Sequence, residues 1–151
     1  MNMQKLLTVS CVFLLVATAA FAQKSKPSKP YKISSIKIVE YDESDGKFGE
    51  EVTKDTFFGN DFSTSLLVTV ELSGDPGSIV PRRNVRLTVT EGRKVTFTRL
   101  AIPGILNQDG KYYIPLWVYG PICDNLKIRA AVTGQTTIST LSRTVNAHCG
   151  E

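Results

Sequence analysis

The residues that could carry out chemistry in this 151-residue chain are few and far apart. His148 is the only histidine, so a Ser/His/Asp triad or a histidine-ligated zinc site would depend on that one side chain. The sequence has no nucleophile-elbow, zinc-protease, phosphate-loop or dinucleotide-binding motif. Carboxylates remain as candidate acids and bases, but no isolated pair of them stands out. We therefore expect a protein that is not an enzyme and needs no cofactor.

One acidic segment, EYDESDGKFGEEVTKD at residues 40–55, is rich in oxygen atoms that a calcium ion could use. Its candidate ligands are Asp42, Asp45 and Glu50. Counted from Asp42, however, the glycine that an EF-hand loop needs at position six comes at position five, as Gly46. The spacing favours a solvated acidic loop and leaves calcium as a weak alternative.

The strongest candidate for ligand binding is the aromatic segment KYYIPLWVYG at residues 111–120. Period-two alternation places Tyr113, Trp117 and Tyr119 on one face of a strand, and Pro115, which cannot donate a ladder hydrogen bond, indicates a sheet edge. An exposed row of these rings could stack on a sugar or contact a protein partner. Alternatively, loops cover this face and the rings belong to the core.

The two C-terminal cysteines, Cys123 and Cys149, predict a disulfide, because paired cysteines in an exported chain are usually bonded. They bracket two strand-like runs around Gly134, so a hairpin is expected between them. Placing the cysteines opposite each other would also pair Arg129 with Arg143, which is unfavourable. We expect the register shifted by one residue, which sets Leu126 opposite Val145 and Ala130 opposite Leu141. A bulge near Ala147 and His148 would then bring the cysteines together.

The N-terminal residues 1–22 predict a secretory signal peptide that is cleaved after Ala22. Lys5 precedes an apolar run that is too short to span a bilayer, so we expect no transmembrane helix. Residues 23–30, QKSKPSKP, are expected to form a flexible basic tether rich in proline and serine. Residues 31–151 then form a single domain. The predicted location is secreted or periplasmic.

The domain is predicted to be all-β, because its apolar residues alternate with period two and no helical period extends over ten residues. About seven strands are expected, with a phase slip near Ser34 and Ser35 and a tight hairpin at Glu91 and Gly92. This spacing resembles the antiparallel β-sandwich of immunoglobulin and fibronectin type III domains. The sequence departs from the immunoglobulin cysteine pattern, because Trp117 precedes both mature cysteines instead of lying between them.

The charge of the chain is modest and unevenly spread. Its formal net charge is +4, and cleavage of the predicted signal peptide removes the positive charge of Lys5. This charge is too small to indicate nucleic-acid binding. The hairpin that contains Glu91 has a threonine and arginine face, for which we expect a solubilising role and, as a minor alternative, a basic binding patch; its predicted members are Arg86, Thr88, Thr90, Lys94, Thr96 and Thr98. The sequence favours an interaction or envelope-associated module whose partner is a protein or glycan, with a carbohydrate or small-ligand binding domain as the alternative.

Overall fold

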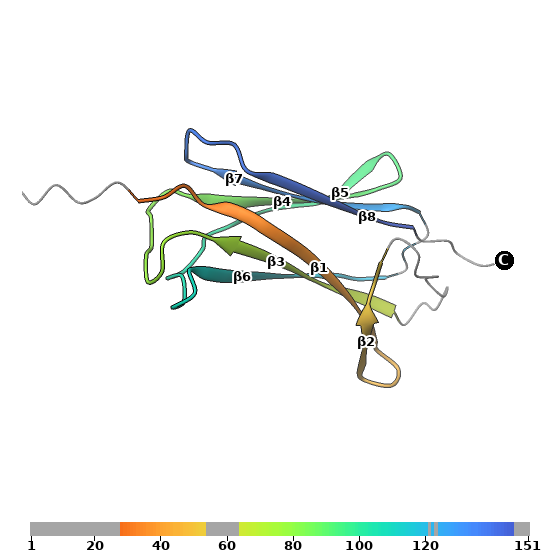
Figure 1. Ribbon diagram of the computed structural model, residues 1–151. Helices are drawn as coiled ribbons and strands as arrows, with labels where there is room; N and C mark the ends of the chain where they lie inside the picture. The colour runs from red at the N-terminus through yellow and green to blue at the C-terminus, as the bar shows by residue number, and fades with distance from the viewer. Residues whose placement is uncertain (1–27, 54–63, 121, 123, 147–151) are drawn as a thin grey trace, which may run out of the picture.

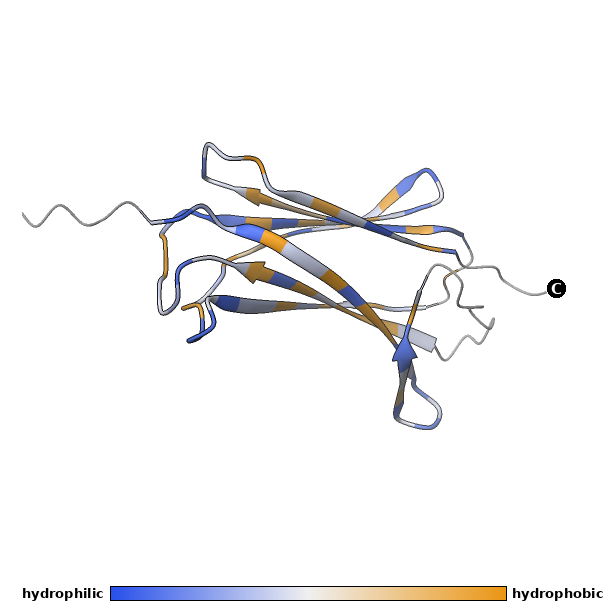
Figure 2. Ribbon diagram, in the orientation of Figure 1, coloured by the Kyte–Doolittle hydropathy of each residue, from blue (hydrophilic) through white to orange (hydrophobic). Residues whose placement is uncertain are grey.

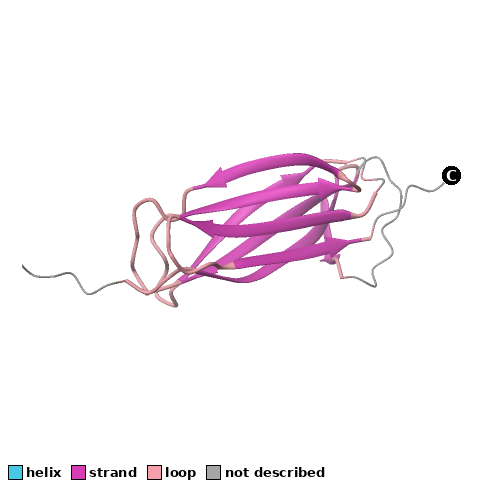
Figure 3. Ribbon diagram, turned by 90° about the horizontal axis from the view of Figure 1, so that it is seen from above, coloured by secondary structure: helices cyan, strands magenta, loops and turns pink. Residues whose placement is uncertain are grey.

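A computed structural model describes residues 28–53, 64–120, 122 and 124–146, and the regular elements in these residues are strands (Figures 1 and 3). They form two facing four-stranded antiparallel sheets, so the predicted all-β sandwich is confirmed. The strands are β1 (Lys32–Asp42), β2 (Lys47–Glu51), β3 (Thr64–Ser73), β4 (Asn84–Glu91), β5 (Lys94–Ala101), β6 (Lys111–Val118), β7 (Leu126–Thr133) and β8 (Thr140–Val145).

The core lies between a sheet of order β2-β1-β3-β6 and a sheet of order β5-β4-β7-β8. Apolar residues alternate with polar ones along the central strands, as the banding in Figure 2 shows. Because successive strand side chains point to opposite faces, the inward set of each strand meets the other sheet. The fully buried inward side chains of the central strands β3, β4 and β7 include Leu66, Val68, Val70, Val85, Leu87, Val89 and Ile128.

The eighth strand, β2, was not predicted, because the acidic segment was expected to be a loop. β2 pairs with the end of β1, setting Tyr41 opposite Phe48 and Asp42 opposite Lys47. All five of its residues, KFGEE, are exposed. A strand that buries none of its side chains has no apolar alternation, which explains why the pattern failed here.

The predicted phase slip in β1 and the predicted β4–β5 hairpin are both present, the turn of the hairpin lying one residue later than expected. The pairing of β1 with β3 shifts by one residue between Ile33 and Ser35, where the phase slip was expected. The β4–β5 hairpin closes through the two residues Gly92 and Arg93, and its register shifts once more next to Val89. β5 is exposed along its length except at Ala101, so its apolar residues do not reach the core as those of β4 do.

The β7–β8 hairpin has the register predicted from its side chains. Leu126 lies opposite Val145, and Ala130 lies opposite Leu141. The predicted bulge at Ala147 and His148 and the predicted disulfide between Cys123 and Cys149 lie outside the described residues. The register predicted from the cross-strand side chains is therefore confirmed, and the disulfide stays a prediction.

Side chains of the other sheet complete the free edge of β1. β2 covers the second half of β1, from Val39 onward. In the first half, Ile33 N donates to Ser139 Oγ over 2.9 Å, and Arg143 Nη1 donates to the Ile36 carbonyl over 2.8 Å. Just before β1, Tyr31 exchanges two hydrogen bonds with the side chain of Gln135. The two sheets are thus joined along this seam by polar side chains.

The end of the predicted tether contacts the domain. Lys29 N donates to Asp75 Oδ2 over 2.7 Å, and Arg83 Nη1 donates to the Lys29 carbonyl over 2.5 Å. The remainder of the tether and the predicted signal peptide lie outside the described residues.

Candidate functional site

The aromatic row predicted on β6 is exposed. β6 is an edge strand, as Pro115 indicated, and its inward residues Ile114 and Leu116 are buried in the core. On the outer face, Tyr113 is 49% exposed and Trp117 is 38% exposed, and Tyr119 directly after the strand is 72% exposed. The sequence left open whether these rings are exposed or covered by loops, and in the structure they face solvent.

Two further rings, Tyr41 of β1 and Phe48 of β2, join Trp117. The Tyr41 and Trp117 ring centroids lie 5.4 Å apart with the planes at 76°, and those of Tyr41 and Phe48 lie 4.9 Å apart. Phe48 and Trp117 are 6.1 Å apart. The pairing explains this meeting, since β1 and β6 flank β3 on either side. These separations are the ones at which aromatic pairs attract each other.

The cluster lines a shallow pocket of about 320 Å³ whose walls are Tyr41, Glu43, Phe48, Trp117 and Tyr119. We call these five residues the aromatic pocket. Glu43 supplies its carboxylate, and Ser65, which is buried beneath, donates a short hydrogen bond to Glu43 Oε1. The pocket therefore combines apolar ring surface with one oriented hydrogen-bond acceptor. Tyr113 lies farther along β6 and is not among its walls.

A second hollow, of about 270 Å³, lies on the other side of Trp117 and Tyr119. Its remaining walls come from β4, β5 and the end of β6: Val89, Thr96, Phe97 and Val118. Trp117 and Tyr119 thus form a ridge between the two hollows. Phe97, which is 39% exposed, extends the aromatic surface beyond the pocket.

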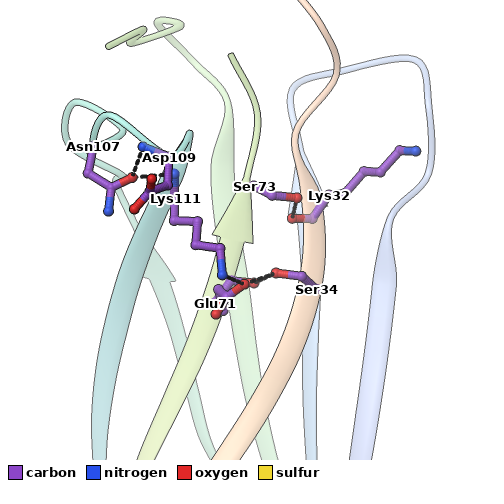
Figure 4. Close-up of polar contacts among 7 residues, drawn as sticks. All are labelled: Lys32, Ser34, Glu71, Ser73, Asn107, Asp109 and Lys111. Atoms are coloured by element: carbon purple, nitrogen blue, oxygen red, sulfur yellow. Dashed lines mark hydrogen bonds and ion pairs between the residues drawn. The ribbon is translucent and has the colours of Figure 1, made fainter. Parts of the chain in front are cut away.

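A polar network lies at the Tyr113 end of β6 (Figure 4). Glu71 Oε1 accepts a hydrogen bond from Ser34 Oγ at 2.8 Å and forms an ion pair with Lys111 Nζ at 3.1 Å. The Ser34 hydrogen bond and then Lys111 lower the pKa of Glu71, and Glu71 raises the pKa of Lys111. The network joins β1, β3 and β6, and both charges are already paired. Its evident role is to hold strands together.

Two of the three acidic candidates for calcium, Asp42 and Asp45, bind groups of the protein itself. Asp42 Oδ1 accepts hydrogen bonds from Ser44 N at 2.8 Å, Ser44 Oγ at 2.6 Å and Asp45 N at 3.2 Å. The Ser44 hydroxyl is the main reason that the pKa of Asp42 is lowered. Asp45 pairs with Lys47 at 3.2 Å. Within the described residues, no group of three or more His, Cys, Asp or Glu side chains, Glu50 included, is placed to hold a metal ion.

The predicted threonine and arginine face is only partly correct. Arg86, Thr88 and Thr90 face outward on β4, but the register shift sets Val95 opposite Thr90 and moves Lys94 opposite Glu91. Cross-strand partners share a face, so Val95 replaces Lys94 on the outer side. The bulge at Thr96 is the physical reason, because one extra residue exchanges the faces of the residues before it.

Sequence reasoning found Trp117 and Tyr119 but missed three walls of the pocket, namely Tyr41, Glu43 and Phe48. Tyr41 lies near the end of a strand that was predicted from its isoleucines, so the ring itself was not considered. Phe48 belongs to β2, the strand that was not predicted. Their only signal is that two aromatic residues flank the Asp-Gly turn of a hairpin, and this becomes informative once the pairing with β3 is known.

No protein-family model matches the sequence, and a search of curated proteins finds no relative of it. In the described part of the chain, no helix has the length and apolar character needed to cross a membrane. The functional argument therefore rests on the geometry of the sandwich.

Proposed function

We propose that this protein is exported and works as a non-enzymatic binding module, with the aromatic pocket as its ligand site. The observation that carries the proposal is the pocket itself, where four rings and one oriented carboxylate from two separate parts of the chain converge on an exposed hollow. A contiguous apolar patch exposed to solvent is typical of an interaction site. The predicted signal peptide supports action outside the cytoplasm.

A glycan is the ligand class that this pocket suits best. Its volume of about 320 Å³ is at the lower end of the range for small-molecule sites. Aromatic rings stack on the apolar face of a sugar, and a carboxylate such as Glu43 accepts hydrogen bonds from sugar hydroxyls. A short saccharide would use both features together.

A protein partner is the second candidate, favoured by the extent of the aromatic surface. The exposed rings continue from Phe48 across the Trp117 and Tyr119 ridge to Phe97. Such a stripe is longer than one sugar ring needs, and exposed aromatic residues are enriched at protein interfaces.

Trp117 provides a direct test, because it is the only tryptophan in the sequence. Titration of the mature protein with a panel of soluble oligosaccharides should give a saturable change in its fluorescence for at least one of them. Phe48→Ala and Glu43→Gln should each weaken that binding at least fivefold. Tyr113→Ala removes a ring of the same strand outside the pocket and should change it less than twofold.

The variants also separate the two candidates. If no oligosaccharide changes the fluorescence, the glycan proposal fails. The protein alternative then requires a partner, captured from native secretions or envelope, that is lost with Trp117→Ala and Phe48→Ala and kept with Tyr113→Ala. If Tyr113→Ala removes ligand and partner as strongly as the pocket variants do, the aromatic pocket is not the site.

We also propose that the sandwich is of the fibronectin type III kind. Support comes from the strand order, in which β5 extends the β4-β7-β8 sheet and β6 joins β3 and β1. A constant-type immunoglobulin domain has seven strands, which correspond to the strands here without β2. In such a domain the strand in the place of β5 belongs to the other sheet and pairs with the strand in the place of β6.

A further inference from the structure

The outer face of the β5-β4-β7-β8 sheet carries a cluster of basic residues on the side of the sandwich opposite the aromatic pocket. The pairing aligns Thr90 with Lys127 and Thr144, and Thr88 with Arg129 and Ser142. Arg86 lies beside Ala131 in the next row, and Arg93 lies in the turn after β4. We call this the basic face, consisting of Arg86, Arg93, Lys127 and Arg129.

The basic face contains an open hollow of about 560 Å³. Three of its lining residues are bases and none is an acid: Thr88, Thr90, Gly92, Arg93, Val95, Lys127 and Arg129. Asp124 brings a carboxylate beside Gly92 at the end of the sheet. It forms no ion pair with Arg93 among the described contacts. The hollow is therefore positively charged and lined by hydroxyl groups.

Three of the four bases of the basic face have no acidic partner among the residues that the structure describes. Four bases elsewhere in the described residues form ion pairs, among them Lys111 with Glu71 and Arg143 with Glu51. No ion pair or hydrogen bond from the side chains of Arg86, Lys127 or Arg129 is present in the described part of the chain. Lys127 and Arg129 are two residues apart on one face, about 7 Å along the strand, and Arg86 is diagonal to Arg129. Like charges this close repel, and a bound anion would relieve the repulsion.

We propose that the basic face binds an anionic polysaccharide through its sulfate or carboxylate groups. The arginine forks and Lys127 suit these anions, and the threonine and serine hydroxyls in the same rows can pair with sugar hydroxyls. Single-stranded nucleic acid is disfavoured, because the outward positions of β4, β7 and β8 in these rows hold no aromatic ring on which a base could stack. On β5 the same face exposes only two aliphatic side chains, Val95 and Leu100, and no aromatic ring, so a membrane is the less favoured ligand.

The test is binding of defined polymers to the mature protein at several salt concentrations. Dextran sulfate presents sulfate groups, polygalacturonate presents carboxylates, and neutral dextran is the uncharged reference. At least one anionic polymer should bind, neutral dextran should not, and the affinity should fall as salt rises. A triple Arg86→Gln, Lys127→Gln, Arg129→Gln variant should bind at least tenfold more weakly and keep a melting temperature no lower than that of the original protein.

A matched control removes the same number of charges elsewhere. Lys32→Gln, Lys37→Gln and Arg99→Gln together take three exposed bases from outside the basic face, and this variant should lose less than twofold. The proposal is overturned if neither anionic polymer binds, or if the control loses as much affinity as the triple variant. It is also overturned if a single-stranded oligonucleotide or phosphatidylglycerol vesicles bind through the basic face while both anionic polymers fail to.

Discussion

At the scale of single residues, Arg143 makes the most demanding set of contacts in the sandwich. It lies opposite Ile128 on the inner side of β8, and its guanidinium reaches across to the other sheet. There it donates to the Ile36 carbonyl at 2.8 Å, to the Val52 carbonyl and to Glu51 Oε1 at 2.6 Å. Ile36 and Val52 are buried residues, so their carbonyl oxygens depend on this partner.

Arg143→Met should destabilise the fold by about 2–4 kcal/mol, because it leaves the carbonyl oxygens of the buried residues Ile36 and Val52 without their hydrogen-bond donor. The free energy of unfolding in urea measures the loss. Arg129→Met on the outer face of the same sheet is the control and should change stability by less than about 0.5 kcal/mol. Equal losses in the two variants would contradict the role assigned to Arg143.

The sequence could not assign this role to Arg143. The pairing argument excluded Arg129 as its cross-strand neighbour, and the register confirms that exclusion. The oxygen atoms that Arg143 contacts come from residues about a hundred positions earlier in the chain, and the approach of β8 to the edge of β1 depends on how the two sheets pack.

At the scale of elements, the turn between β7 and β8 depends on one glycine. Gly134 has a φ of +75°, and a Cβ at this position would lie 1.9 Å from the Arg82 carbonyl oxygen. Both the backbone conformation and the packing therefore exclude a side chain. Gly77 has a similar φ of +65° but open space around it.

Gly134→Ala should destabilise the protein by about 2–4 kcal/mol, since it adds a steric clash with the backbone to the cost of a left-handed conformation. Gly77→Ala has the conformational cost alone and should lose only about 1 kcal/mol. Thermal and urea unfolding of the two variants measure the difference. A Gly134→Ala variant as stable as Gly77→Ala would show that the turn can move away from Arg82.

Strands whose side chains alternate between core and solvent were predictable. β3 from Leu66 onward, β4 and β7 alternate with period two because one face of each meets the other sheet. β2 was missed because it is exposed at every residue, whereas β5 was predicted as the second strand of the hairpin at Glu91 and Gly92 although it is exposed at every residue except Ala101. Pairing with a neighbouring strand holds them in place, and local hydropathy does not record pairing.

At the scale of the whole molecule, stability should depend on pH at both ends of the range. The pKa of Glu71 is lowered in the folded protein from its ordinary value of 4.5, and that of Asp42 is lowered as well. Each carboxylate stabilises the fold above its ordinary pKa, and this stabilisation is lost as the pH falls through the folded value. The pKa of Lys111 is raised above 10.5, so its contribution is lost as the pH rises through the folded value.

We therefore expect a stability plateau between roughly pH 5 and pH 10, with losses on either side. Urea midpoints measured across this range test it. Glu71→Gln should reduce the loss of stability at low pH. Because it removes the partner of Lys111, it should also reduce the loss of stability at high pH. Glu50→Gln, which changes an exposed carboxyl on β2, is the control and should leave both losses unchanged.

Only part of the aromatic pocket could be predicted, because the pocket depends on the order of strands in the whole sheet. Trp117 and Tyr119 stood out because they share one face of a single strand. Tyr41 and Phe48 come from the other side of β3, and only the complete sheet order brings them beside Trp117. A site shared by β1, β2 and β6, which lie on both sides of β3, is a property of topology, and sequence patterns describe one strand at a time.

The polar seam along β1 also limits how this protein can associate with other chains. An open strand edge is a template on which a foreign strand can assemble. Because Ser139 and Arg143 already occupy hydrogen-bonding groups in the first half of β1, that stretch offers no free ladder for strand exchange or fibril growth. The outermost strands of the two sheets are β2, β6, β5 and β8. Of these, β5 and β6 border the aromatic ridge, so a ligand bound there would also shield two of the edges on which a foreign strand could assemble.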